Sequence, residues 1–236
     1  EISDRANEQS TTQVKRTIPF TAKANGITNI SIPTNDLFES TINLYINGKL
    51  EDQVFMADGA WGVDYNTNTT SLKKFVVTNS NTPKAKDEFS VFRNAEIAGT
   101  TPDYITVYKL LRAGGTPQDL SSYKSLKFTA IGNAPVVITL VKQSIKNWDD
   151  QYNIQLPLST ETKDYAIGLE DFKSIAFNSN IDLKDISSII ITIVPPNKGK
   201  STDLQLAVSN ISFSKEDMNY INSLKEVSMS AFPNPV

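Results

Sequence analysis

The sequence predicts an all-β protein, with an antiparallel β-sandwich that follows a smaller β module. Three observations lead to this prediction. Short segments rich in β-branched and aromatic residues recur along the chain, and turn signals such as Asn-Gly and Asp-Gly fall between many of them. Only one short stretch near the C-terminus has helical spacing of its apolar residues. Short strands joined by short turns favour an antiparallel sandwich over alternating strands and helices.

The first 80 residues predict the small β module. Residues 1–13 are polar and indicate a tail or linker, or, at residues 1–5, the end of a preceding helix. The best local hairpin turns at Asn47-Gly48, a pair that accepts the positive φ of a tight turn. The strands expected in this part lie at residues 14–21, 27–33, 41–47, 50–56, 61–65 and 72–78.

A second set of strands predicts the sandwich. In the clearest stretch, residues 119–142, a strand with alternating Leu126, Phe128 and Ala130 is followed by a turn at residues 131–135. A β-branched strand then runs back. The strands expected in this part lie at residues 89–94, 104–111, 125–130, 136–141, 152–158, 164–168, 188–194 and 204–213.

Residues 79–87 have the proline and polar content of a linker or a long surface loop. They divide the chain into a small β module at residues 1–80, which can follow an upstream domain, and a sandwich at residues 84–214. Residues 215–236 are expected to be a linker and the start of another domain. The sequence leaves open whether residues 1–80 form a separate domain or contribute strands to the sandwich, because both halves are β-rich.

The composition excludes several classes of function. The chain has no Cys and no His, which excludes Ser-His-Asp and Cys-His triads and the commonest transition-metal sites. Charges nearly balance, at a net charge of -3, so no long-range field indicates a nucleic-acid partner. No run of about 18 apolar residues occurs, so no membrane span is predicted. Catalysis by paired carboxylates, by Tyr or Lys, or by an oxygen-ligated metal is supported by no motif.

Trp148 is the leading candidate for ligand binding. It lies in a polar stretch between two expected strands, with Asp149, Asp150 and Tyr152 close by in the sequence. A flat indole stacks on the apolar face of a sugar ring, while neighbouring polar groups bond the sugar hydroxyls. The alternative is that Trp148 folds back and caps the edge of the sandwich. Asp149 and Asp150 are also suited to a hard cation, but a set of metal ligands cannot be assigned.

Tyr104, Tyr108 and Arg112 form a second candidate surface. On an extended strand these residues share one face, and the residues between them form a more apolar face. The tyrosine face is therefore expected to point to solvent and to end in a cation, although Leu110 on the same face weakens this interpretation. Trp61 lies on an apolar strand face and is expected in the core.

The segments of the expected sandwich occur in a characteristic order. They are EFSVFRNAE, YITVYKLLRAGG, DLSSYKSLKFTAIGNAPVVITLVK, NWDDQYNIQLPL, DYAIGLEDFKS, DISSIIITIV and TDLQLAVSNISF. As an ordered set, they resemble the galactose-binding-like jelly rolls found among carbohydrate-binding modules of bacterial polysaccharide-degrading enzymes. The resemblance implies a jelly roll that binds a polysaccharide or other glycan beside an upstream catalytic domain of the same polypeptide. It implies no certain cofactor, although similar modules often hold a structural calcium.

A second resemblance lies at the end of the chain. Phe232, Pro233, Asn234 and Pro235 resemble the opening of the C-terminal sorting domain of the type IX secretion system of Bacteroidetes. The alternative is an ordinary Pro-rich turn. The resemblance implies the type IX secretion machinery as a partner, and a protein that is secreted or held at the cell surface.

Together these observations predict a non-catalytic, carbohydrate-binding module of a secreted or cell-surface multidomain protein. The alternative function is a structural spacer or adhesin segment with no small ligand of its own. In that case the aromatic residues all lie in the core.

Overall fold

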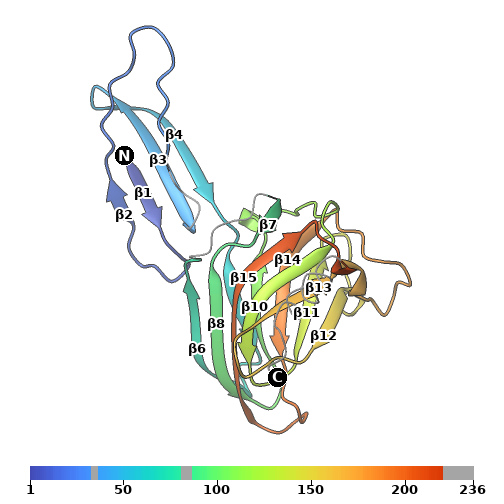
Figure 1. Cartoon of the computed structure of the whole chain (residues 1–236). Helices are drawn as coiled ribbons and strands as arrows, with labels where there is room; N and C mark the ends of the chain where they lie inside the picture. The colour runs from blue at the N-terminus through green and yellow to red at the C-terminus, as the bar shows by residue number, and fades with distance from the viewer. Residues whose placement is uncertain (33–36, 81–86, 220–236) are drawn as a thin grey trace, which may run out of the picture.

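The computed structural model describes residues 1–32, 37–80 and 87–219, and these residues form two connected parts (Figure 1). An N-terminal four-stranded antiparallel sheet projects from a two-layer β-sandwich. The strands are β1 (Ile2–Arg5), β2 (Val14–Arg16), β3 (Glu39–Ile46), β4 (Lys49–Ala57), β5 (Trp61–Tyr65), β6 (Ser71–Thr78), β7 (Glu88–Ser90), β8 (Asn94–Thr101), β9 (Ile105–Leu110), β10 (Ser125–Gly132), β11 (Val136–Lys142), β12 (Tyr152–Leu156), β13 (Lys163–Gly168), β14 (Ile186–Ile193) and β15 (Thr202–Ser214). The 3-10 turns are η1 (Ala113–Gly115), η2 (Trp148–Asp150) and η3 (Leu169–Asp171). The all-β prediction is confirmed.

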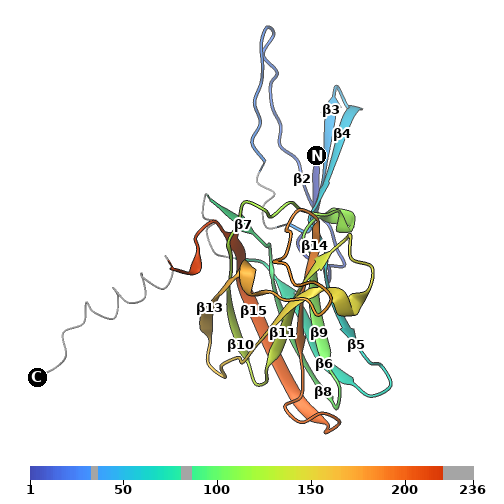
Figure 2. The ribbon, with the colours of Figure 1, turned by 90° about the vertical axis from the view of Figure 1, so that its right-hand side faces the viewer.

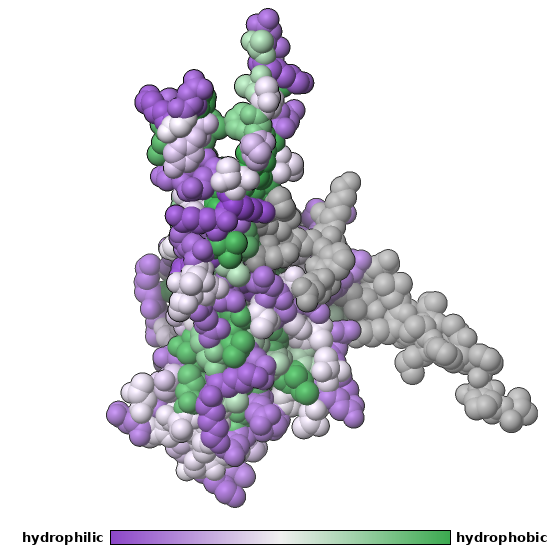
Figure 3. Space-filling model, turned by 90° about the vertical axis from the view of Figure 1, so that its left-hand side faces the viewer, coloured by the Kyte–Doolittle hydropathy of each residue, from purple (hydrophilic) through white to green (hydrophobic). Residues whose placement is uncertain are grey.

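The N-terminal sheet has the strand order β2-β1-β3-β4. The predicted hairpin is confirmed as β3–β4, because Asn47 and Gly48 adopt φ angles of 51° and 80°, the left-handed region that Asn and Gly tolerate best. An arm formed by residues 17–32 rises beside this hairpin (Figure 2). Figure 3 shows apolar residues on the sides of the arm and the hairpin that face each other.

The sandwich consists of two antiparallel sheets. We call the sheet with the strand order β12-β11-β14-β9-β5 the front sheet, whatever the view. The other sheet, with the order β13-β10-β15-β8-β6 and the short β7 paired to β15, is the back sheet. From β8 onward almost every connection crosses from one sheet to the other, and only β11 and β12 are consecutive strands within one sheet. This is jelly-roll connectivity, and the predicted antiparallel sandwich is confirmed.

The core lies between the two sheets and is built from alternate residues of each strand. On β11, Val136, Ile138 and Leu140 are buried, and each pairs with a buried isoleucine of β14. Leu126 and Phe213 are fully buried side chains of the back sheet. Each such side chain contributes about 1.5–3 kcal/mol by leaving water. The other residues of the front strands point outward, and they form the face on which a candidate site lies.

Two predictions about the organisation of the chain are wrong. β5 pairs with β9 and β6 pairs with β8, so residues 61–78 belong to the sandwich and the expected boundary near residue 80 is misplaced. Of the two alternatives, the first 80 residues therefore contribute strands to the sandwich. The strands β10 and β11 lie in different sheets, so residues 133–135 cross the sandwich instead of closing a hairpin. A short turn can connect two strands that lie in different sheets as well as two neighbouring strands of one sheet.

The predictions for the N-terminus are also corrected in part. The expected tail contains β1, which pairs with β3 and buries Ile2. Of the strands expected at residues 14–21 and 27–33, the described residues form only β2, at Val14–Arg16. Pro19, which has no N–H to donate to a ladder, lies shortly after it. Most of the expected linker, including the Phe-Pro-Asn-Pro pattern, lies outside the described residues. In the described ranges no helix is long and apolar enough to cross a membrane.

Candidate functional site

A groove of about 470 Å³ crosses the outer face of the front sheet. The residues that line this aromatic groove are Asp64, Tyr104, Thr106, Tyr108, Trp148, Ile190 and Thr192. Strand register brings them together. Thr106 of β9 lies opposite Asp64 of β5 and Thr192 of β14. Tyr108 lies opposite Ile190, so all of these side chains point to the same face of the sheet.

The ring of Tyr108 lies against the neighbouring strand because Gly62 has no side chain. A Cβ atom at Gly62 would be 2.2 Å from both Cζ and Oη of Tyr108, a distance that no real side chain could tolerate. The ring is therefore laid over β5 and forms one wall of the aromatic groove. The glycine is what allows the tyrosine to adopt this position.

Tyr104 is held on the same wall by a carboxylate. Its hydroxyl donates a hydrogen bond of 3.2 Å to Oδ2 of Asp64. Burial, and then the negative charge of Asp64, raises the pKa of Tyr104 above its ordinary value. Tyr104 is therefore a neutral hydrogen-bonding group across the physiological range, and Asp64 is a charged acceptor beside it.

The floor of the aromatic groove combines hydroxyl groups with an apolar surface. The hydroxyls of Thr106 and Thr192 are 2.8 Å apart and bond each other across β9 and β14. Ile190 lies next to this pair and is half-buried. Hydroxyls at fixed positions beside apolar carbon atoms suit a ligand that has both hydroxyl groups and an apolar face.

Trp148 forms the opposite wall from a rigid loop. It is the first residue of η2, and Asn147 caps this turn with its side-chain oxygen. The buried side chain of Gln151 accepts a hydrogen bond of 2.8 Å from the backbone N–H of Lys142 and donates to two carbonyls of the same loop. The indole remains 53% exposed, which argues against the alternative in which Trp148 folds back and caps the edge of the sandwich. A large exposed ring on a fixed loop is suited to contact a ligand.

The structure brings together three of the predicted site residues, namely Trp148, Tyr104 and Tyr108. Asp149 and Asp150 follow Trp148 in η2 but do not line the aromatic groove. The backbone carbonyl of Asp150 accepts a hydrogen bond of 2.6 Å from the hydroxyl of Ser174, so this end of the turn is tied to a neighbouring loop.

The prediction that Tyr152 contacts a ligand is wrong. Its side chain is only 3% exposed, and it points inward from β12. The ring stacks on Phe177 with centroids 6.1 Å apart, and its hydroxyl donates to the carbonyl of Ser179 at 3.2 Å. The loop that contains Phe177 and Ser179 covers the ring, and this loop is distant from Tyr152 in the sequence.

Arg112 does not extend the tyrosine surface. Strand β9 ends at Leu110, and Arg112 precedes η1 and lines a different pocket, between the N-terminal sheet and the sandwich. Trp61, by contrast, lies where the sequence predicts: it is 3% exposed, and its indole N–H donates to the carbonyl of Phe92 at 3.1 Å.

Sequence reasoning missed Asp64, Thr106, Ile190 and Thr192 as site residues. All four lie on strands that the sequence predicts, and their outward positions follow from alternation. What alternation does not reveal is that β5 and β14 flank β9. Within the described ranges, no cluster of three or more acidic side chains is placed to hold a metal ion.

Comparisons with known proteins give structural similarity only. No protein-family profile and no curated protein sequence matches the chain. One similar solved structure is the family 11 carbohydrate-binding module from Clostridium thermocellum in complex with a β-1,3-1,4-mixed-linked tetrasaccharide. The TM-score is 0.44 and the sequence identity 16%, over 65% of this chain and 88% of that chain. Another is a variant of a family 29 carbohydrate-binding module complexed with mannohexaose, with a TM-score of 0.38 and 13% identity, over 62% of this chain and 95% of that chain.

Proposed function

We propose that this chain is a non-catalytic carbohydrate-binding module that holds a glycan in the aromatic groove. The observation that carries the proposal is the convergence of Trp148 and the tyrosines Tyr104 and Tyr108 on one groove with a floor of paired threonine hydroxyls. A sugar ring presents an apolar C–H face and a rim of hydroxyl groups. Aromatic walls suit the first, and the hydroxyls and carboxylate of this groove suit the second.

The charge of the groove favours a neutral glycan. Among the described residues that line it, Asp64 is the single charged one, and none is Lys or Arg. An anionic polysaccharide or a nucleic acid would bring negative charge close to this carboxylate without a cation to compensate it. A neutral saccharide meets no such repulsion, and its hydroxyls can donate hydrogen bonds to Asp64.

The same chemistry supports binding without catalysis. Hydrolysis of a glycosidic bond by the usual route requires two carboxyl groups on either side of the bond. The part of the chain that the structure describes places one carboxyl group, that of Asp64, in the groove. A module of this kind acts by raising the local concentration of an attached catalytic domain on its polysaccharide, an effect of tethering that needs no reaction from these residues. The upstream catalytic domain is part of this proposal.

Secretion or attachment at the cell surface completes the proposal. Its support is the resemblance of Phe232, Pro233, Asn234 and Pro235 to the start of a type IX sorting domain. Fractionation of the source cells tests it: the protein is expected in the culture medium or accessible to protease on intact cells. Detection in the cytoplasm alone would contradict it.

Affinity gel electrophoresis on neutral β-glucans, mannans and xylans tests the binding proposal. We expect at least one glycan to retard the protein, and Trp148→Ala to abolish the retardation because it removes one wall of the groove. Tyr45→Ala is the matched control, since Tyr45 is 43% exposed on the N-terminal sheet and lies outside the groove. If every glycan that binds retards the wild-type protein and Trp148→Ala equally, the proposal is wrong.

One observation favours a structural or adhesin role for the N-terminal sheet. Among the described residues, eleven of the fifteen exposed large apolar side chains lie between Val14 and Met56. An apolar surface of this extent is typical of a protein contact and not of a free surface. Solution scattering and sedimentation of the protein test this role, because a spacer that contacts a neighbour is expected to associate through this sheet. A strictly monomeric protein at high concentration would count against it.

A further inference from the structure

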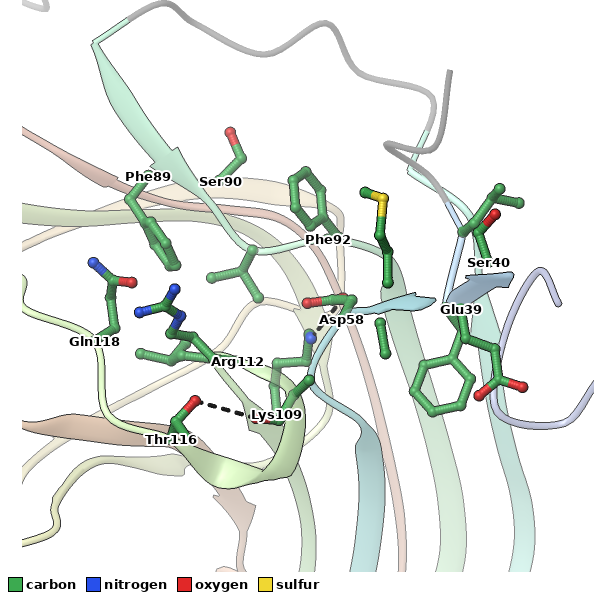
Figure 4. A pocket seen from close by; sticks show the side chains of 17 residues that line it. Glu39, Ser40, Asp58, Phe89, Ser90, Phe92, Lys109, Arg112, Thr116 and Gln118 are labelled. Carbon is green, nitrogen blue, oxygen red and sulfur yellow. Dashed lines mark hydrogen bonds and ion pairs between the residues drawn. The ribbon is translucent and has the colours of Figure 1, made fainter. Parts of the chain in front are cut away.

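A second pocket lies where the N-terminal sheet meets the sandwich (Figure 4). We call it the junction pocket, and its volume is about 520 Å³. Its walls come from the end of β4, the segment that follows β7, and the loop after β9. It lies apart from the aromatic groove, and the two share no lining residue.

Most charges at the junction pocket are already neutralised by a partner. Glu39 pairs with Arg5 through two contacts of 2.9 and 3.0 Å. Asp58 lies 2.8 Å from Nζ of Lys109 and 2.9 Å from Nη1 of Arg93. Lys109 also donates to two backbone carbonyls, so its three N–H groups are used. These groups leave little free charge for a ligand.

Arg112 is the exception. Within the described part of the chain its guanidinium group makes no hydrogen bond or ion pair, whereas its backbone carbonyl accepts a hydrogen bond of 3.1 Å from the N–H of Gly115. Its backbone is extended, and the following turn contains Gly114 and Gly115, both with φ of 68°. In Figure 4 the guanidinium group extends between Phe89 and Gln118 into the pocket. The junction pocket therefore carries one uncompensated positive charge.

The neighbours of Arg112 suit a sugar-sized organic ligand. Phe89 and Phe92 provide aromatic surface on one side, and the side chains of Thr116 and Gln118 provide polar groups. Both polar side chains also donate a hydrogen bond to a backbone carbonyl of their own loop. An arginine presents a planar fork of N–H donors that matches the two oxygens of a carboxylate. The pocket thus combines a carboxylate-binding group with aromatic and hydroxyl surface.

We propose that the junction pocket is a second binding site, specific for a saccharide that carries a carboxylate, with Arg112 as the group that binds the carboxylate. The proposal does not depend on the neutral glycan proposed for the aromatic groove. A nucleic acid is disfavoured, because a polyanion requires several cations along its path and this pocket offers one free cation among the described residues. The ligand class is a uronic-acid oligosaccharide.

Isothermal titration of the whole chain with trigalacturonate, at low ionic strength, tests the proposal. We expect saturable binding that Arg112→Gln weakens at least tenfold and that Arg112→Lys only partly restores, because an ammonium group does not bind both oxygens in a plane. Lys200→Gln is the matched control, since it removes one exposed positive charge from a distant loop. Trp148→Ala is expected to bind trigalacturonate as the wild-type protein does.

Three outcomes would overturn the proposal: the absence of saturable binding, unchanged affinity of Arg112→Gln, or an equal loss in Lys200→Gln. Competition separates a saccharide site from a simple anion site. If sodium acetate displaces trigalacturonate at equal concentration of carboxylate, the pocket binds any carboxylate and the saccharide assignment is wrong. Cellotriose, a neutral probe, keeps the two proposals distinguishable, because its binding reports on the aromatic groove alone and should respond to Trp148→Ala and not to Arg112→Gln.

Discussion

Replacing Arg93 with methionine should destabilise the junction between the N-terminal sheet and the sandwich. The side chain of Arg93 is fully buried. Its Nη2 lies 2.6 Å from Oε1 of Glu8 and donates to the carbonyl of Gly59 at 2.9 Å. Its Nη1 lies 2.9 Å from Oδ2 of Asp58 outside hydrogen-bonding geometry, so this contact is an ion pair alone.

The size of the effect follows from what remains after the substitution. Removing one partner of a buried ion pair costs about 3–5 kcal/mol, because the other charge is left buried. Here each carboxylate keeps one partner. Glu8 still accepts the backbone N–H of Trp61 at 2.6 Å, and Asp58 still contacts Lys109. We therefore expect the low end of the range, about 3 kcal/mol, which is a large part of a typical stability of about 5–15 kcal/mol.

Urea unfolding followed by tryptophan fluorescence measures this loss, because Trp61 lies next to the network and is buried. With an m-value of about 3 kcal/mol/M, the midpoint of unfolding should fall by about 1 M. Glu8→Gln keeps an acceptor for the N–H of Trp61 and is expected to cost less than Arg93→Met. A loss below about 1 kcal/mol for Arg93→Met would refute the reasoning, since the buried charges would then contribute no more than exposed ones.

Three further predictions concern the aromatic groove and the junction. Gly62→Ala should move the ring of Tyr108 by at least about 1.2 Å, which is the difference between 2.2 Å and an ordinary contact of 3.4 Å. The protein should stay folded and bind its glycan more weakly, and an unchanged affinity would contradict this expectation. Burial lowers the pKa of Lys109 from 10.5 to about 8. Between these two pH values Lys109 binds more protons in the unfolded chain than in the folded protein, so the stability that this group contributes rises with pH. The stability of wild type relative to Lys109→Met should therefore increase by about 3 kcal/mol from pH 8 to 10.5 in urea unfolding, and a constant difference would be inconsistent with a lowered pKa. Asp64→Asn should lower the pKa of Tyr104 toward its ordinary value in a spectrophotometric titration, and no change would show that burial alone raises it.

The part of the fold that the sequence predicts is the part decided by local chemistry. The Asn47-Gly48 hairpin is an example, because both residues must take positive φ and few other pairs do so readily. The pairing of strands is decided by contacts between distant residues. For this reason the sequence shows that β10 and β11 are strands, but it does not show that they belong to different sheets.

The same distinction holds for the candidate site. The exposure of Trp148 is predictable from its polar neighbours, and that of the tyrosines of β9 from the alternation of the strand. Both observations concern only a few adjacent residues. Asp64 and Thr192 join them only through the register of β5 and β14 with β9. The prediction for Tyr152 is wrong because the loop that covers it lies some 25 residues further along the chain, where Phe177 stacks on its ring.

Quenching of tryptophan fluorescence by acrylamide, with and without a bound glycan, tests the central claim most directly. The chain has two tryptophans: Trp61 is 3% exposed and Trp148 is 53% exposed, so quenching of the free protein reports almost entirely on Trp148. If a sugar ring stacks on this indole, saturation with a neutral glycan should protect the fluorescence from the quencher. A glycan that binds the protein but leaves the quenching unchanged would contradict the assignment of the aromatic groove as the binding site.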